Sequence, residues 1–288
     1  MKRFITFFNL WGLLAVLIGW NPTIKLPFDQ FIHQNTLADT QYIEYTPHAS
    51  SNEASYARNL DALAIALHPG SDFTQENQPT PGSLNHCKSL VYRTLASLPP
   101  EDTAQLKDLT LYFADEGRRG LGGGSTIILR CQNVTDNELV GVLVHEMGHI
   151  VDTGLLQGNA SAGESEFMDG TQPVYQDDPS LLFYRLDFTD SKTLRSSASP
   201  LDFVSGYAQS DPFEDFAETY NYYILHGDEF RTLIETNVVL LQKYNFLKTR
   251  VFNGKEFFNG DDARKTDLLQ RDYDTTVLNY DLNKFFVT

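Results

Sequence analysis

Two histidines and a glutamate occur in this chain at a spacing that suits a metal ion. The stretch VLVHEMGHIVD covers residues 142–152 and contains His145, Glu146 and His149. Residues four apart on an α-helix differ by about 40° in direction and by one turn in height, so both imidazoles can reach one point. Glu146 is rotated by about 100° from His145 and can therefore reach a water on the metal rather than the metal itself. The pattern predicts a zinc ion with a hydrolytic water.

A third protein ligand is required, because a catalytic zinc site has three protein ligands and one open position. No further histidine follows until His226, so a carboxylate is expected. The helix predicted over 211–220 offers Glu214 and Glu218, which are spaced i, i+4 and share one face. Helix physics alone leaves their roles open. Asp211 and Glu214 also have the spacing of a capping box, and Glu218 could be a solvated charge.

Asp152 is a second acidic candidate on the histidine helix. It lies seven residues after His145 and points in the same direction. It suits a supporting role, in which its carboxylate accepts a hydrogen bond from the far ring nitrogen of His149. The alternative is a carboxylate in solvent at the end of the helix.

Several elements must position these residues. Thr135 and Glu138 form the spacing of a capping box at the start of the histidine helix, and Gly154 is a plausible stop. Alternating apolar residues predict strands, and longer periodic or capped segments predict helices. The strands are expected over 108–115 and 125–131, and the helices over 53–67, 83–97, 211–225 and 228–248.

The glycine run over 116–125 lacks the lysine of a phosphate loop and is interpreted as a hairpin connection or as a mobile lip beside a cleft. In the second case, 125–131 would be an edge strand on which an extended peptide could pair. We therefore expect substrate contacts from Ile127, Ile128 and Leu129.

Two motifs together resemble a known family. HEMGHIVD carries an aspartate three residues after its second histidine, and GYAQSDPFEDFAETY places Tyr207 seven residues before Glu214, with Glu-Asp-Phe-Ala-Glu over 214–218. This combination resembles the catalytic domain of anthrax lethal factor and the Pro-Pro endopeptidases, which are gluzincin-type zinc metallopeptidases. The matched motifs cover about twenty-five residues, and substrate preference does not transfer with them.

The resemblance implies a role for each matched residue. One zinc ion would be bound by His145, His149 and Glu214. Glu146 would activate the water, Tyr207 would donate its hydroxyl to the developing oxyanion, and Glu218 would orient His145. The implied fold is α+β and zincin-like with two lobes: a small mixed sheet packed on the zinc helix, and a helical lower lobe.

The expected organisation assigns 53–254 to the metallopeptidase domain, with the upper lobe extending to about 154. Residues 1–21 are interpreted as a signal or membrane anchor, because Lys2 and Arg3 precede an apolar stretch. Residues 22–52 are interpreted as a linker and 255–288 as a C-terminal tail. The expected location is extracytoplasmic, either membrane-anchored by the N-terminus or secreted.

Composition limits the partners. The net charge of −16 argues against nucleic acid, because phosphate binding needs clustered Lys and Arg. A peptide or protein substrate is expected, with membrane contact through the N-terminal segment. Cys87 and Cys131 are the two cysteines, and the sequence favours a disulfide and two buried thiols equally.

Three functions follow from these observations. The first is a zinc-dependent endopeptidase. The second is a catalytically inactive zincin-fold binding or scaffold protein at the cell surface. The third is an interaction module in which the His-Glu-x-x-His spacing is accidental.

Overall fold

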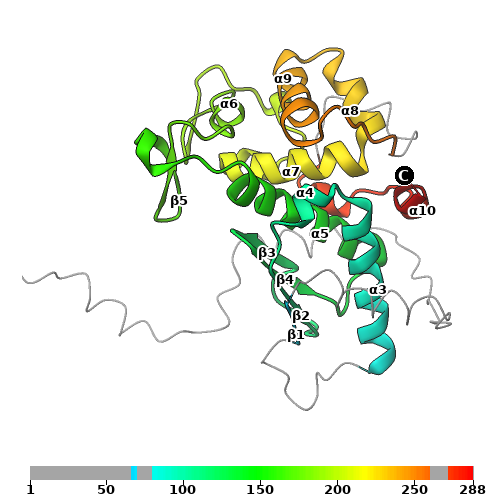
Figure 1. The fold of residues 1–288 in the computed structure, drawn as a ribbon. Coiled ribbons are helices and arrows are strands. Elements are labelled where there is room, and N and C mark those ends of the chain that lie inside the picture. The colour runs from blue at the N-terminus through cyan, green and yellow to red at the C-terminus, as the bar shows by residue number, and fades with distance from the viewer. Residues whose placement is uncertain (1–65, 70–79, 260–271, 288) are drawn as a thin grey trace, which may run out of the picture. The chain divides into compact units, whose positions relative to one another are not determined.

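The computed structural model describes residues 66–69, 80–259 and 272–287 (Figure 1). The predicted anchor over 1–21, the linker over 22–52 and most of the helix over 53–67 lie outside these ranges. Among the described residues, no helix combines the length and apolar character needed to cross a bilayer.

A four-stranded mixed sheet precedes the histidine helix. Its strands are β1 (Ala66–Pro69), β2 (Asp108–Tyr112), β3 (Gly120–Gly123) and β4 (Thr126–Arg130), in the spatial order β1-β2-β4-β3. The β1-β2 and β2-β4 pairs are parallel, and β3 runs antiparallel to β4. The strand expected over 108–115 is confirmed over Asp108–Tyr112 and ends three residues early. The helix expected over 53–67 is wrong at its last two residues. Ala66 and Leu67 instead belong to strand β1, which pairs with β2.

The strand order corrects the predicted substrate strand. β4 lies between β2 and β3, so its backbone groups are already paired on both sides. Ile127 and Leu129 are fully buried in the core, and only Ile128 is partly exposed. An extended peptide therefore has no free edge along Ile127–Leu129. Among the described residues, β3 is the edge strand at this end of the sheet, because it pairs only with β4. It lies inside the glycine run.

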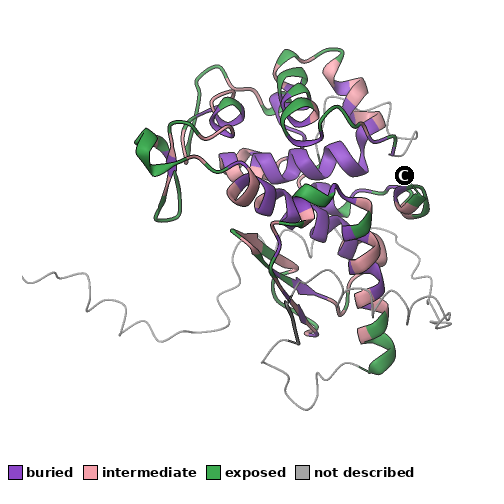
Figure 2. Cartoon of the chain, viewed as in Figure 1, coloured by how far each residue is buried: buried purple, intermediate pink, exposed green. Residues whose placement is uncertain are grey.

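The histidine helix is α5 (Asp136–Ile150), continued by a π-helical turn, η2 (Val151–Leu155). Thr135 caps it as expected, accepting a hydrogen bond from the Glu138 backbone N–H at 3.2 Å. The helix lies between β3 and β4 of the sheet and helix α7 (Pro212–Leu225), and Figure 1 shows α5 and α7 stacked on each other. Both helices are buried over most of their length (Figure 2), so they form the centre of the core.

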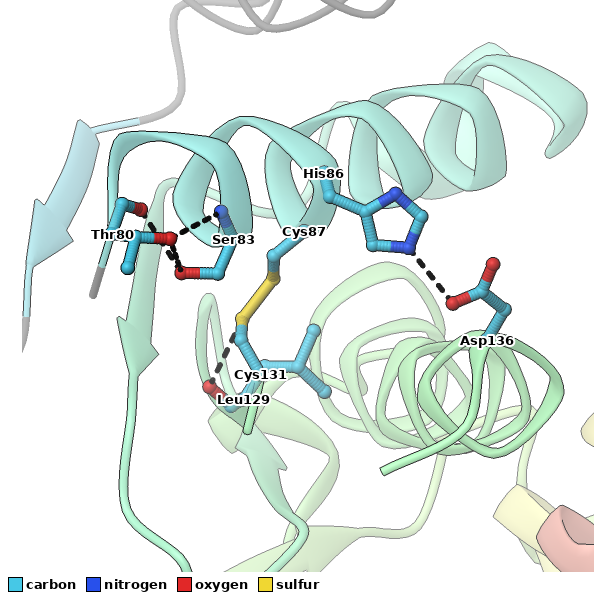
Figure 3. Close-up of a disulfide and its surroundings, with 7 residues drawn as sticks. All are labelled: Thr80, Ser83, His86, Cys87, Leu129, Cys131 and Asp136. Carbon is cyan, nitrogen blue, oxygen red and sulfur yellow. Dashed lines mark hydrogen bonds and ion pairs between the residues drawn. A yellow bond between two sulfur atoms is a disulfide. The ribbon is translucent and has the colours of Figure 1, made fainter. Parts of the chain in front are cut away.

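Helices α3 (Pro81–Ser97) and α4 (Pro100–Thr103) complete the sheet-containing lobe. Figure 3 shows a disulfide between Cys87 of α3 and Cys131, the residue after β4. His86 adds a contact of 2.9 Å between its Nε2 and Asp136 at the start of α5. The structure thus resolves the open question on the cysteines, and α3 is fastened to both the sheet and the histidine helix.

The other lobe is mainly helical. Its remaining elements are η3 (Ala160–Ala162), β5 (Glu164–Asp169), β6 (Gln172–Tyr175), α6 (Leu181–Tyr184), β7 (Phe188–Asp190), β8 (Thr193–Leu194), η4 (Pro200–Asp202), η5 (Tyr207–Gln209), α8 (Gly227–Ile234), α9 (Val238–Phe246) and η6 (Leu247–Val251). The helix expected over 228–248 is interrupted, because the Asn237 side chain accepts from the Leu240 N–H and begins a new helix.

A buried ion cluster joins the elements of this lobe. Lys243 of α9 is fully buried, and its Nζ lies 2.8 Å from Asp187 and 2.6 Å from Asp215 of α7. A buried cation needs such partners, since leaving it unpaired costs several kcal/mol.

The C-terminal residues return to the centre of the fold. The turn η8 (Thr275–Val277) packs against α5, and α10 (Leu282–Val287) packs against α3. The overall architecture is the α+β, two-lobed arrangement expected, with a small mixed sheet on α5 and helices beyond it.

Candidate metal centre

The three predicted zinc ligands converge. His145 Nε2 lies 3.3 Å from Glu214 Oε2, and His149 Nε2 lies 3.4 Å from the same oxygen. One donor atom from each of the three residues lies within 4.8 Å of the others. Two atoms that are each about 2.0–2.1 Å from a tetrahedral zinc ion are about 3.3–3.4 Å apart. The imidazole-to-carboxylate distances therefore suit a shared zinc ion.

The protonation pattern points the same way. Glu218 Oε1 lies 2.8 Å from His145 Nδ1. A carboxylate oxygen accepts hydrogen bonds, so this placement favours the tautomer of His145 with its hydrogen on Nδ1. A neutral His145 then directs the lone pair of Nε2 at Glu214. Glu214 Oε2 is buried and makes no hydrogen bond within the described residues. A cation between these lone pairs removes the conflict, so the residues fit a divalent metal ion.

Electrostatics show how strongly this cluster favours positive charge. Burial alone lowers the pKa of His145, but Glu214 and Glu218 raise it well above its usual value. Burial likewise opposes ionisation of Glu214, yet the two imidazoles hold the pKa of that carboxyl far below its ordinary range. The carboxylates around the two imidazoles thus favour positive charge at the point where the three residues converge.

The helix crossing brings the ligands together. A Cβ atom at Gly148 of α5 would lie 2.8 Å from the Cα of Ala217 of α7. Only glycine permits this approach without a shift of either backbone. The close crossing places Glu214, in the first turn of α7, opposite His145 and His149. Asp211 begins that helix, since its side chain accepts from the N–H groups of Phe213 and Glu214 at 3.0 and 2.9 Å.

Glu146 lies beside the metal cluster under strand β3. It is buried, and burial raises the pKa of its carboxyl, while the nearby imidazoles and a hydrogen bond from the Gly122 backbone N–H lower it. A Cβ atom at Gly120 would lie 2.3 Å from Glu146 Oε1, which shows how closely the strand covers this side chain. A carboxyl with a raised pKa, shielded from bulk water, suits a general base.

Tyr207 reaches the same centre from η5. Its hydroxyl donates to Glu214 Oε1 at 2.7 Å, and its ring stacks on His145 with centroids 6.1 Å apart. Burial and the charge of Glu214 raise the pKa of Tyr207, so the hydroxyl keeps its proton. A phenol has one proton to donate, so Tyr207 serves a group bound at this site by transferring its hydrogen bond from Glu214 to that group.

Asp152 does not take the predicted position. Its two oxygens accept from the Ser180 and Tyr184 hydroxyls, both at 2.5 Å, and among the described residues it forms no hydrogen bond or ion pair with His149. Burial raises the pKa of Asp152 to about 7, against the lowering effect of these two hydroxyls. The π-helical turn η2 begins at Val151, so the regular helical geometry behind the prediction ends before residue 152. Asp152 instead connects the histidine helix to the other lobe.

The site contains positions that the sequence did not reveal. Gly120 and Gly122 cover Glu146, and the backbone N–H of Thr275 donates to Glu218 Oε2 at 2.9 Å. The glycines were visible as a run, but nothing indicated that they form a strand. Thr275 acts through its backbone, which leaves no trace in residue type.

The fold and this cluster fit a two-lobed zinc-binding metallopeptidase. The sequence profile of a family described as "Putative zinc-binding metallo-peptidase" matches residues 133–284, which is just over half of the chain. The chain belongs to this family. The matched range contains α5, α7, Tyr207 and Thr275. Comparison with curated proteins and with solved structures gave no match.

Proposed function

We propose that this chain is a zinc-dependent endopeptidase that acts outside the cytoplasm. The observation that carries the proposal is the convergence of His145, His149 and Glu214 on one point, with the buried carboxylate of Glu146 beside it. Zinc, when bound, polarises a carbonyl oxygen and lowers the pKa of a bound water toward neutrality.

The protein's own groups perform the proton transfers. Glu146 takes a proton from the attacking water and delivers it to the leaving amine. Burial, which raises its pKa, makes it a better proton acceptor near neutral pH. Tyr207, whose hydroxyl donates to Glu214 in the structure, gives up that hydrogen bond and donates instead to the oxyanion that develops on the scissile carbonyl. Glu218 fixes the tautomer of His145.

The proposal includes the kinship to the lethal factor and Pro-Pro endopeptidase type. The support is the placement of the residues that the resemblance singles out. Glu214 joins the imidazoles, Glu218 contacts His145 from one turn farther along α7, and Tyr207 lies against Glu214.

The proposed location rests on two independent features. The N-terminal residues 1–21 have a basic start followed by an apolar stretch, as in a signal or anchor. The Cys87–Cys131 disulfide belongs in an oxidising compartment. Protease accessibility on intact cells, with a cytoplasmic protein as the control, tests this location. Protection of the chain until the cells are broken would contradict it.

The test of the activity is Glu146→Gln in the full chain. We expect the wild type to contain zinc and to cleave members of a peptide library, read by mass spectrometry. Glu146→Gln should keep the zinc and lose cleavage, whereas Glu164→Gln, at an exposed glutamate of β5, should behave as wild type. A wild type with zinc but without cleavage would favour the inactive binding protein. A wild type without zinc would favour the accidental motif.

A further inference from the structure

A short C-terminal segment, residues 272–276, contacts the candidate site from three sides; we call it the C-terminal strap. Its first contacts hold the backbone around Tyr207. The Asp272 carbonyl accepts from the Gly206 N–H at 2.8 Å, and the Tyr273 carbonyl accepts from the Tyr207 N–H at 2.6 Å. The Tyr273 and Tyr207 rings also lie against each other, with centroids 5.9 Å apart. The strap thus fixes where the Tyr207 hydroxyl can reach.

The second contact of the strap ends on the metal ligand His145. The Thr275 N–H donates to Glu218 Oε2 at 2.9 Å, and the other oxygen of Glu218 lies 2.8 Å from His145 Nδ1. Glu218 is fully buried, so no water can replace this donor without rearrangement. The strap also lies directly on α5, because a Cβ atom at Gly141 would be 2.6 Å from the Thr276 carbonyl oxygen.

The third contact of the strap fixes the start of strand β3. Arg119, the residue before β3, forms an ion pair with Asp274 and donates to Thr276 Oγ1 at 2.7 Å. The same guanidinium lies 3.3 Å from Glu138 of α5. Arg119 and Asp274 are both largely buried. This ion pair links the strap to the strand that covers Glu146.

We propose that the C-terminal strap, together with Arg119, is a set of positioning residues for the metallopeptidase site. One segment holds Tyr207, the Glu218–His145 pair and strand β3, which come from three separate parts of the chain. A segment that only stabilised the fold would not need to form its hydrogen bonds with Tyr207, Glu218 and the start of β3. The inference rests on the proposed function, because it assigns the strap a role in that site.

The first test removes the backbone N–H of Thr275, which donates to Glu218. Thr275 is the first residue of η8, and the preceding Asp274 has an extended backbone (φ −141°, ψ 128°). Proline is tolerated at a first helical position and favours an extended residue before it. Thr275→Pro therefore removes the donor to Glu218, and its ring carbon Cδ takes the place of the amide hydrogen, so this variant also displaces the buried Glu218 carboxylate. Thr275→Val is the matched control, since it keeps the N–H and removes a buried hydroxyl that makes no hydrogen bond.

We expect Thr275→Pro in the full chain to lower kcat and zinc affinity about tenfold each, as is usual for loss of a partner that orients a metal-bound histidine. KM should stay within about twofold of wild type, because the N–H does not contact the peptide. With Co²⁺ in place of zinc, the visible absorption spectrum should shift for Thr275→Pro and not for Thr275→Val. Equal kinetics, affinity and spectra for the two variants would overturn the inference.

A second pair of variants decides the question if Thr275→Pro does not fold. Asp274→Asn removes the charge that faces Arg119, and Asp274→Glu restores it. Tyr280→Phe, four residues beyond the strap, is the control, because the Tyr280 hydroxyl donates to the Asn137 carbonyl of α5 at 2.8 Å, away from the site. We expect kcat to fall about tenfold for Asp274→Asn, to recover in part for Asp274→Glu, and to stay near wild type for Tyr280→Phe.

Failure of the inference and failure of the proposed function give different results. If the wild type binds zinc and cleaves peptides, but Asp274→Asn and Tyr280→Phe lose the same small amount of thermal stability and no kcat, the strap is only structural. If the wild type neither binds zinc nor cleaves peptides, the proposed function is wrong, and the positioning role is wrong with it.

Discussion

Strand β3 lies so close to the general-base candidate that a single methyl group tests the arrangement. A Cβ atom at Gly122 would lie 2.7 Å from the Glu146 backbone oxygen and 2.9 Å from its Oε2. The backbone oxygen belongs to helix α5 and cannot move independently. To restore ordinary van der Waals separation, the strand must therefore retreat by about 1 Å. That shift also lengthens the hydrogen bond from the Gly122 N–H to the Glu146 carboxylate.

We expect Gly122→Ala to lower kcat by up to about 100-fold, since a misplacement of about 1 Å in a reacting group can cost that much. The corresponding rise in the activation barrier is about 2.7 kcal/mol. Zinc content should stay at the wild-type level, because the three atoms nearest to a Cβ atom at this position all belong to Glu146 and not to a metal ligand. The matched control is Gly123→Ala on the same strand, where a Cβ atom meets nothing within 4 Å.

The assay compares kcat and KM for a peptide that the wild type cleaves, with zinc measured by elemental analysis and folding by thermal unfolding. If Gly122→Ala and Gly123→Ala have the same kcat while both hold zinc, the close packing of β3 on Glu146 does not position the carboxylate. Loss of zinc in Gly122→Ala alone would show that the strand supports the ligands instead.

Three further predictions concern stability, measured by urea denaturation. Reducing the disulfide between Cys87 and Cys131, which are 44 residues apart, should lower the free energy of unfolding by about 4 kcal/mol from chain entropy; an unchanged transition would contradict this. Lys243→Met leaves two buried aspartates without their cation and should cost about 3–5 kcal/mol, whereas Lys248→Met, at a half-buried pair, should cost far less. Burial raises the pKa of Asp102 from 3.8 to about 7, so the folded state keeps a proton that the unfolded state releases, and stability falls as pH rises through this window. Asp102→Asn should therefore gain stability relative to wild type as the pH rises from about 4 to about 7, and a constant difference in the free energy of unfolding would refute the sign.

The parts of the site that the sequence predicted are those set by local helical geometry. The spacing of His145 and His149 places both on one face of any regular helix, and a capped start at Asp211 places Glu214 in the first turn of the next. These relations hold whatever the rest of the chain does. The same reasoning failed for Asp152, because the helix changes to a π turn at Val151.

The parts that escaped prediction depend on non-local pairing. Glycine has low strand propensity, so Gly120–Gly123 had the pattern of a loop, and the apolar strand Thr126–Arg130 was taken as the edge. The order of strands in a sheet is decided by pairing across the chain, which periodicity does not record. Gly120 and Gly122 are explained only once Glu146 is seen beneath them, since a side chain at either position would collide with it.

The small residues inside the two motifs explain why local patterns succeeded in predicting a site between distant helices. Gly148 lies between His145 and the end of α5, and Ala217 lies between Glu214 and Glu218. These two residues meet where α5 and α7 cross, at a separation that a larger side chain on either would increase. An increase there would move the Glu214 carboxylate away from both imidazoles together. The metal ligands and the small residues that set the distance between the two helices therefore belong to the same two short motifs. A motif that supplies the ligands thus also supplies the residue that brings them together.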